Sequence, residues 1–221
     1  MTAWLDVAGR CFNADAAISV VPLMGDQCCY VVDDALAHPD GLIDWAAGQT
    51  FASPLDFPYP GQVLDAPSAL TQRIADYFAQ HVRRRLGARR ILDLTVRLSM
   101  VTVAPHELDP RQWQCHRDRV AADDSGILFA ASVLYLFRNP ALGGTSFYAP
   151  RLSAAQTDQM LADSQLLEAR EFSARYGLLP GYMAGSNAYF ERVAQVPAAL
   201  AATQIPPLMA TSNSPTLTVL R

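Results

Sequence analysis

Lysine is absent from this chain of 221 residues, and cysteine and histidine are scarce. All 17 basic residues are arginine and the net charge is −4, which gives no general attraction to nucleic acid or to an anionic membrane. With abundant alanine, the arginine bias indicates GC-rich coding of a bacterial kind. The cysteines are Cys11, Cys28, Cys29 and Cys115. They form no CxxC pair, so we expect no disulfide framework and a reducing compartment.

A long apolar run is missing too, as is the basic and apolar start of a signal peptide. The longest apolar stretch, 127–137, is too short to cross a bilayer. We therefore expect a cytoplasmic protein with neither membrane nor nucleic acid as a partner. At 51% hydrophobic and 17% charged residues, the composition is typical of one globular domain.

Hydrophobic patterning predicts two helical parts followed mainly by strands. The expected strands are 28–32, 91–104, 127–137, 145–148 and 188–193. The expected helices are a short one with Pro39 near its first position, a long one at 66–86 that ends before Gly87, and 153–176. The short helix would have Leu42, Ile43, Ala46 and Ala47 on one face, and a loop is expected at 105–114. This order favours an α+β fold, with helices packed on a strand-rich core. The loop at 51–65 and the helical insertion at 153–176 are candidate substrate-covering segments.

The chemistry of the sequence centres on His116-Arg117-Asp118. A His and an Asp two apart on a strand point to the same side. They supply two thirds of the 2-His-1-carboxylate set that holds non-haem iron(II). Taken alone the motif also fits a structural ion pair. The same spacing in His38-Pro39-Asp40 is better explained as the start of a helix.

Several short sequence segments around this motif extend the pattern. They are Tyr30 to Leu36, Trp113 to Asp118, Val133 to Arg138, Gly143 to Tyr148 and Phe190 to Ala198. Their order, a His-x-Asp motif before a buried strand and a Gly-Gly-Thr turn, resembles the iron(II)/2-oxoglutarate-dependent dioxygenase superfamily in its prolyl-hydroxylase-like branch. Within that branch the chain is similar to an uncharacterised bacterial family of oxygenase-like proteins of unknown function. The resemblance spans roughly residues 28–198.

This resemblance implies a distorted double-stranded β-helix, a jelly-roll or cupin-like core flanked by N-terminal helices. It also implies hydroxylation of an unactivated C–H bond in an unidentified small molecule or peptide, coupled to oxidative decarboxylation of 2-oxoglutarate. His116 and Asp118 would hold Fe(II), and no other residue is implied as catalytic. Tyr135 and Thr145 are candidates for the 2-oxoglutarate pocket, beside which Gly143 and Gly144 allow a close backbone approach. Tyr135 equally fits a core aromatic with a satisfied hydroxyl, and Thr145 fits a hairpin residue after two glycines.

The family pattern further implies a second histidine on a late strand and a basic residue about ten positions on. Residues 199–221 contain no histidine, acid or aromatic residue, and one base, Arg221. We therefore separate an oxygenase-like domain at 1–198 from an atypical tail at 199–221, and expect a core that is incomplete at the C-terminus. We hypothesise an out-of-frame tail. A natural truncation, or a rebuilt ligand set in which His106 joins His116 and Asp118, stays open.

Other function classes have weaker support. The chain has no phosphate-binding glycine loop, no HExxH and no GxSxG. Cys115 adjoins His116, but neighbouring residues of a strand face opposite sides, which suits proton transfer poorly. Cys28 and Cys29 are better explained by core packing than by redox chemistry. The alternative to an enzyme is a non-catalytic protein on the same scaffold that binds a small molecule or a partner. A product that folds poorly because it lacks a core strand is a third possibility.

Overall fold

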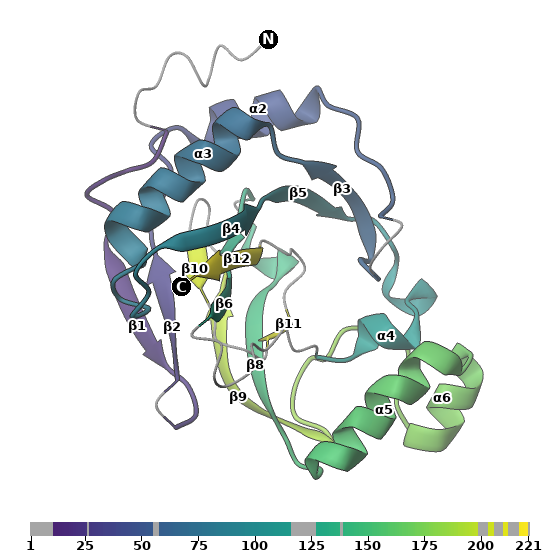
Figure 1. Ribbon diagram of the computed structural model, residues 1–221. Coiled ribbons are helices and arrows are strands. Elements are labelled where there is room, and N and C mark those ends of the chain that lie inside the picture. Colours follow the sequence, from purple (N-terminus) through teal and green to yellow (C-terminus); the bar gives the residue numbers. More distant parts are fainter. Residues whose placement is uncertain are drawn as a thin grey trace.

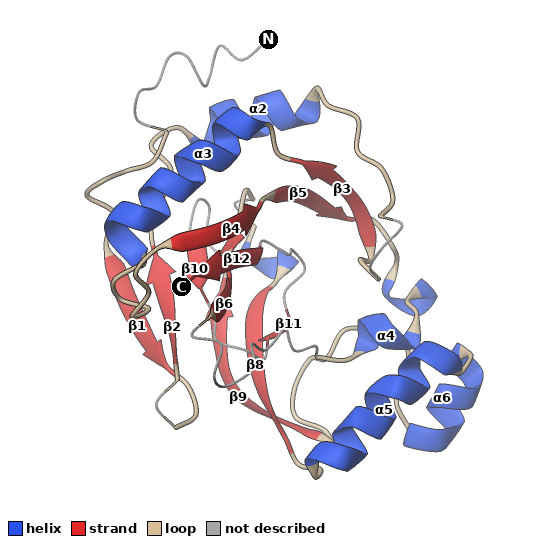
Figure 2. Cartoon of the chain, viewed as in Figure 1, coloured by secondary structure: helices blue, strands red, loops and turns tan. Residues whose placement is uncertain are grey.

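The computed structural model describes residues 11–25, 27–54, 58–115, 127–137, 139–198, 203–205, 210–211 and 217–220. Within these ranges the chain is a mixed fold of helices and small antiparallel sheets (Figures 1 and 2). The α+β prediction is confirmed at this level. Among the described residues, no helix has both the length and the apolar character needed to cross a membrane.

The strands form four small sheets, and the pairings between the described strands are antiparallel. The first has the order β1 (Ile18–Pro22), β2 (Cys28–Val32), β10 (Thr203–Ile205), β7 (Val133–Leu134). The second has the order β11 (Ala210–Thr211), β8 (Gly144–Pro150), β9 (Phe190–Pro197). The third has the order β4 (Ile91–Thr95), β12 (Leu217–Leu220), β6 (Leu128–Ala131), and the last pairs β3 (Gly61–Asp65) with β5 (Arg97–Val101).

The helices lie in two groups (Figure 1). The first holds α2 (Pro39–Ala47), α3 (Ser68–Tyr77) and a π-helical turn η1 (Phe78–Val82), and lies beside β4 and β5. The second holds α4 (Pro110–Trp113), α5 (Ala154–Leu166) and α6 (Ala169–Tyr176). Two short 3₁₀ turns, η2 (Pro105–Glu107) and η3 (Pro140–Leu142), complete the set. The predicted helix start at Pro39 is confirmed, since this proline occupies the first turn of α2.

Several predicted boundaries were wrong. Residues 61–65, expected within an irregular loop, form β3, because the backbone of Gly61 can pass close to that of Met100 on β5. The expected strand at 91–104 divides into β4 and β5 around Val96. The apolar stretch 127–137 divides at Ser132 into β6 and β7, which belong to different sheets. The loop at 105–114 contains η2 and α4.

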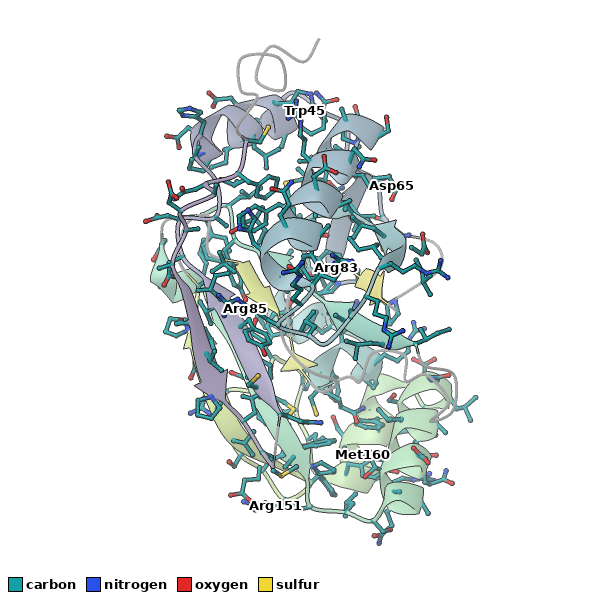
Figure 3. All side chains as sticks on the ribbon, turned by 60° about the vertical axis from the view of Figure 1, so that its left-hand side comes forward. Trp45, Asp65, Arg83, Arg85, Arg151 and Met160 are labelled. Carbon is teal, nitrogen blue, oxygen red and sulfur yellow. The ribbon has the colours of Figure 1, made fainter. Side chains whose placement is uncertain are left out.

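The second helix group packs over an aromatic core. Trp113 meets Phe172 edge to face, with ring centroids 5.9 Å apart, and Met160 of α5 is fully buried in the same cluster (Figure 3). The buried carboxylate of Asp163 joins α5 to α6. Tyr176 and Arg175 both donate to its Oδ2, at 2.7 and 2.5 Å, and these bonds hold the pKa of Asp163 below its usual value. The insertion is thus a packed unit of the core.

Three short strands come from the segment set apart above as an atypical tail. β10 lies between β2 and β7, and β12 lies between β4 and β6. A strand with neighbours on both sides satisfies backbone groups of both of them. The end of the chain therefore supplies interior strands to two of the sheets.

Candidate functional site

Two of the predicted site residues meet in the interior. The phenolic oxygen of Tyr135 lies 2.6 Å from Oγ1 of Thr145, and both side chains are buried. Tyr135 directly follows β7, and Thr145 is the second residue of β8. The η3 turn between them reverses the chain, so residues ten apart in sequence form one hydroxyl pair.

The Gly143-Gly144 turn holds Thr145 in place. Gly143 has a φ of +114°, which favours glycine, and its carbonyl accepts a hydrogen bond from the backbone N–H of Ala198 at 3.1 Å. A Cβ on Gly144 would lie 2.9 Å from the Ala198 nitrogen and 3.0 Å from the Pro197 Cα. The close backbone approach expected of these glycines is confirmed, and it fixes the register of β8 on β9.

Tyr135 sits in an apolar setting. Phe137 meets its ring edge to face at a centroid distance of 5.5 Å, and the buried thiol of Cys29 lies nearby. Burial raises the pKa of Tyr135 to about 12, although the hydrogen bond with Thr145 lowers it in part. The phenol is therefore neutral at physiological pH and can donate a hydrogen bond.

The raised pKa of Tyr135 predicts an alkaline loss of stability. Because the phenolate forms more readily in the unfolded chain, the stabilisation is complete below pH 10 and is lost as the pH rises towards 12. The other tyrosines and Cys115 also titrate at alkaline pH, but they do so in both proteins, so the difference from Tyr135→Phe isolates Tyr135. We expect wild type to lose about 2 kcal/mol more than Tyr135→Phe between pH 10 and 12. Urea unfolding at several pH values in this range measures the free energy of unfolding of both proteins. If it changes equally with pH in wild type and in Tyr135→Phe, the prediction is contradicted.

The predicted metal ligands His116 and Asp118 lie outside the described residues. The chain leading to them is anchored in the core. Trp113 Nε1 donates to the Leu108 carbonyl at 2.7 Å, and the amide nitrogen of the buried Gln114 donates to the Pro110 carbonyl at 3.2 Å. The Gln114 Oε1 atom is buried and has no hydrogen-bond partner. These two hydrogen bonds hold Trp113 and Gln114, which precede the His-x-Asp motif, in place.

The cysteines show no sign of nucleophilic chemistry. Burial raises the pKa of the Cys115 thiol to about 12, so this thiol is neutral at physiological pH. Cys29 is fully buried in a small apolar cluster, as predicted for core packing. All four cysteines fall within the described residues, and no disulfide joins them.

His106 occupies the η2 turn and is exposed. In the part of the chain that the structure describes, no group of three or more His, Cys, Asp and Glu side chains lies close enough to hold a metal ion. The two residues proposed to join His106 fall outside that part. The rebuilt ligand set therefore stays a prediction.

A cavity of about 780 Å³ opens between the first helix group, β5 and the β7–η3 region. Tyr135 forms part of its wall, whereas no residue of 153–176 does. The face of α2 predicted from helical spacing also lines it. Its members are Leu42, Ile43, Ala46 and Ala47. Phe51 and Tyr59 come from the loop that was predicted to cover a substrate. Helical spacing predicted that the four α2 side chains face inward, but it gave no signal that they border a cavity.

Arg97 is the charged side chain on the described part of this wall. Its Nε donates to Oδ1 of Asp65 at 3.0 Å across the β3–β5 pair. Other arginines gather beyond η1, where Figure 3 labels Arg83 and Arg85. Arg85 is exposed, as expected of a solvated face, but the Nε of Arg83 is buried with no hydrogen-bond partner.

Comparison with known proteins gives a family and nothing more specific. No curated protein and no solved structure matches the chain. A family of unknown function, DUF6445, matches residues 14–201. The match takes in β1 through β9, the hydroxyl pair and the His-x-Asp segment, and it ends before β10. The chain belongs to this family, DUF6445.

Proposed function

We propose that the protein is an iron(II)- and 2-oxoglutarate-dependent oxygenase that hydroxylates a substrate bound in the 780 Å³ cavity. The observation that carries this proposal is the buried hydroxyl pair of Tyr135 and Thr145, whose oxygens lie 2.6 Å apart and of which Tyr135 lines the cavity. These are the residues that the resemblance implies for the 2-oxoglutarate pocket. Iron(II) and 2-oxoglutarate, when bound, would let the site activate O₂, with one oxygen atom entering the substrate C–H bond and the other entering the succinate formed as 2-oxoglutarate loses CO₂.

The hydroxyl pair suits a carboxylate ligand. Tyr135 is neutral and can donate, and Thr145 can donate or accept, so both hydroxyls can turn towards an anionic oxygen. Burial makes such hydrogen bonds stronger than they are in water. The rigid β8–β9 pairing fixes the Thr145 backbone, so its hydroxyl meets the ligand at little entropic cost. His116 and Asp118 are the residues proposed to hold the metal.

The sheet order also supports the finer fold proposal, a double-stranded β-helix. In jelly rolls, antiparallel strands that are far apart in sequence interleave in two sheets. Here β10 and β12 from the end of the chain each lie between strands that occur much earlier. This arrangement is the one expected if the late strands close the core, rather than leave it incomplete.

A non-catalytic binding protein is the second candidate function. The observation that favours it is the absence of any histidine after His116, since two protein ligands hold iron(II) poorly. A mostly apolar cavity would serve either function. Metal binding separates the two candidates.

Anaerobic iron(II) titration is the direct test. We expect a weak visible charge-transfer band that needs iron, 2-oxoglutarate and His116, and that His116→Ala abolishes. His38→Ala is the matched control, because His38 has the same spacing to an Asp but lies exposed at the start of α2. It should leave the band unchanged. His106→Ala tests the rebuilt ligand set, which predicts at least a tenfold loss of iron affinity.

Each result has a clear meaning. A band that disappears in His116→Ala and persists in His38→Ala supports the oxygenase. If wild type is folded and takes up no iron with 2-oxoglutarate present, the oxygenase proposal fails and the binding protein remains.

A further inference from the structure

We propose that the cavity binds an uncharged, largely apolar small molecule that offers one or more neutral hydrogen-bond acceptors. The proposal that such a molecule binds is argued from the cavity walls and does not depend on the proposed function. The assignment of this molecule as the substrate rests on the proposed function.

The inner walls are apolar. α2 and α3 contribute Leu42 and Leu70, η1 contributes Phe78, and β5 contributes Leu98 from the opposite side. All four are buried, and they belong to the two hydrophobic clusters below the first helix group. A ligand in contact with these walls gains about 25 cal/mol for each Å² of apolar surface that it removes from water.

The rim of the cavity is apolar as well. Met100, Val101, Leu142 and Tyr182 line it and are 42%, 38%, 59% and 37% exposed. They come from β5, from η3 and from the segment after α6, so distant parts of the chain converge at one opening. Exposed apolar side chains that gather around a hollow mark a binding site more often than single ones do. The entrance, like the interior, therefore favours apolar ligands.

Charge argues against an ionised ligand. Arg97 is the one charged side chain on the described part of the wall, and its Nε already donates to Asp65. The described wall includes no acid that could pair with a ligand cation. An ionised ligand against these apolar walls would thus lose hydration without a matching counter-charge, whereas a carboxylate at the Tyr135–Thr145 pair, where the proposed function places 2-oxoglutarate, would keep two hydrogen-bond donors.

Tyrosines supply neutral hydroxyl groups instead. Tyr59, Tyr77, Tyr135 and Tyr182 line the wall, and the hydroxyl of Tyr135 is already paired with that of Thr145. Burial raises the pKa of Tyr77 and of Tyr182, so these two keep their protons at physiological pH. Neutral phenols bind carbonyl, ether or hydroxyl oxygens of a ligand. This combination, an apolar wall with a few hydroxyl groups, is typical of small-molecule sites.

The size of the cavity favours a small molecule over a protein partner. Its volume of about 780 Å³ lies within the range of roughly 300–1,000 Å³ that is usual for small-molecule pockets. It reaches inward to Tyr135, which is buried well below the rim. A protein surface would cover the opening and leave this depth unfilled.

Binding of the neutral dye N-phenyl-1-naphthylamine, followed by its fluorescence, tests the proposal on the full chain. Decan-1-ol and decanoate then compete for the site at pH 7.5. They share an alkyl chain and differ in charge. We expect dye binding that decan-1-ol displaces at concentrations at least tenfold lower than decanoate.

Two filling variants locate the site. Ala46→Trp and Ala47→Trp place an indole on the cavity face of α2, whereas Ala155→Trp places one on the exposed surface of α5. We expect both α2 variants to weaken dye binding at least tenfold and Ala155→Trp to leave it unchanged. Thermal unfolding of each variant shows whether the protein is still folded, so that weaker dye binding can be assigned to the filled cavity. Two α2 positions are used so that the test remains possible if one of the variants does not fold.

The outcomes also separate this inference from the proposed function. Absent dye binding, equal competition by decanoate, or unchanged binding in both folded α2 variants would overturn the cavity proposal, whatever the iron titration shows. Dye binding with the expected selectivity, in a protein that takes up no iron, would support the cavity proposal and reject the oxygenase.

Discussion

Gly144→Ala is expected to destabilise the protein by roughly 3 kcal/mol, about as much as a severe overpacking change in a core. The added methyl group would lie 2.9 Å from the Ala198 nitrogen and 3.0 Å from the Pro197 Cα, and closer still to the Val196 carbonyl oxygen. These contacts are backbone atoms of a paired strand, which cannot rotate away as a side chain can. The β8–β9 pairing must therefore separate at the point where Thr145 begins its contact with Tyr135.

Gly185→Ala is the matched control. A Cβ at Gly185 meets no atom within 4 Å, and its backbone is not in the left-handed region. We expect this control to unfold within about 0.5 kcal/mol of wild type, as is usual for substitutions away from special features. Urea unfolding followed by circular dichroism compares them. A Gly144→Ala protein as stable as the control would show that β8 does not approach β9 as closely as described.

The hydroxyl pair is the part of the candidate site that sequence reasoning reached best. Tyr135 and Thr145 were selected by resemblance, and the Gly143-Gly144 turn gave a physical reason for a compact approach. Their direct contact could not be deduced. Tyr135 directly follows β7 and Thr145 lies on β8, which belong to different sheets, and spacing along the chain does not tell how sheets pack.

The cavity escaped sequence analysis for a related reason. Helical spacing assigns Leu42 and Ala46 to an inward face, and a face that lines a hollow has the same pattern as a face that packs. The division of 127–137 at Ser132 was also hidden. A continuous apolar run is compatible with one long buried strand or with two short ones.

Arg97 shows what a motif search leaves out. It has no motif around it and lies on a short strand, yet among the described residues it is the charged group on the cavity wall, and it pairs with Asp65 from the neighbouring strand. The register of β3 on β5 brings the two together. Antiparallel register depends on long-range pairing, which a single sequence does not specify where the flanking strands are short.

The end of the chain was judged by composition, and its strand signal was overlooked. Leu217-Thr218-Val219-Leu220 is rich in residues with high strand propensity, and it forms β12 between β4 and β6. The abrupt loss of charge and aromatic residues drew attention away from this pattern. Whether the tail is read in its native frame is a separate question, which resequencing of the gene addresses.

Gln204→Pro is the variant that tests the contribution of this end of the chain. Gln204 is the middle residue of β10, opposite Val31 of β2 and Val133 of β7. In a strand with neighbours on both sides every backbone N–H faces a partner strand, and proline both removes that donor and adds a ring. We expect a loss of roughly 3 kcal/mol in the free energy of unfolding.

Gln204→Ala is the control for the side chain, because it keeps the backbone N–H. It should change the free energy of unfolding by less than about 1 kcal/mol, the usual span of strand propensity. Urea unfolding measures both variants against wild type. If Gln204→Pro unfolds at the wild-type midpoint, β10 does not join β2 to β7. If only the proline variant is destabilised, β10, which lies beyond the residues that match the family, is needed to complete the first sheet. The stability of the core would then depend on a segment that its composition had set apart as an atypical tail.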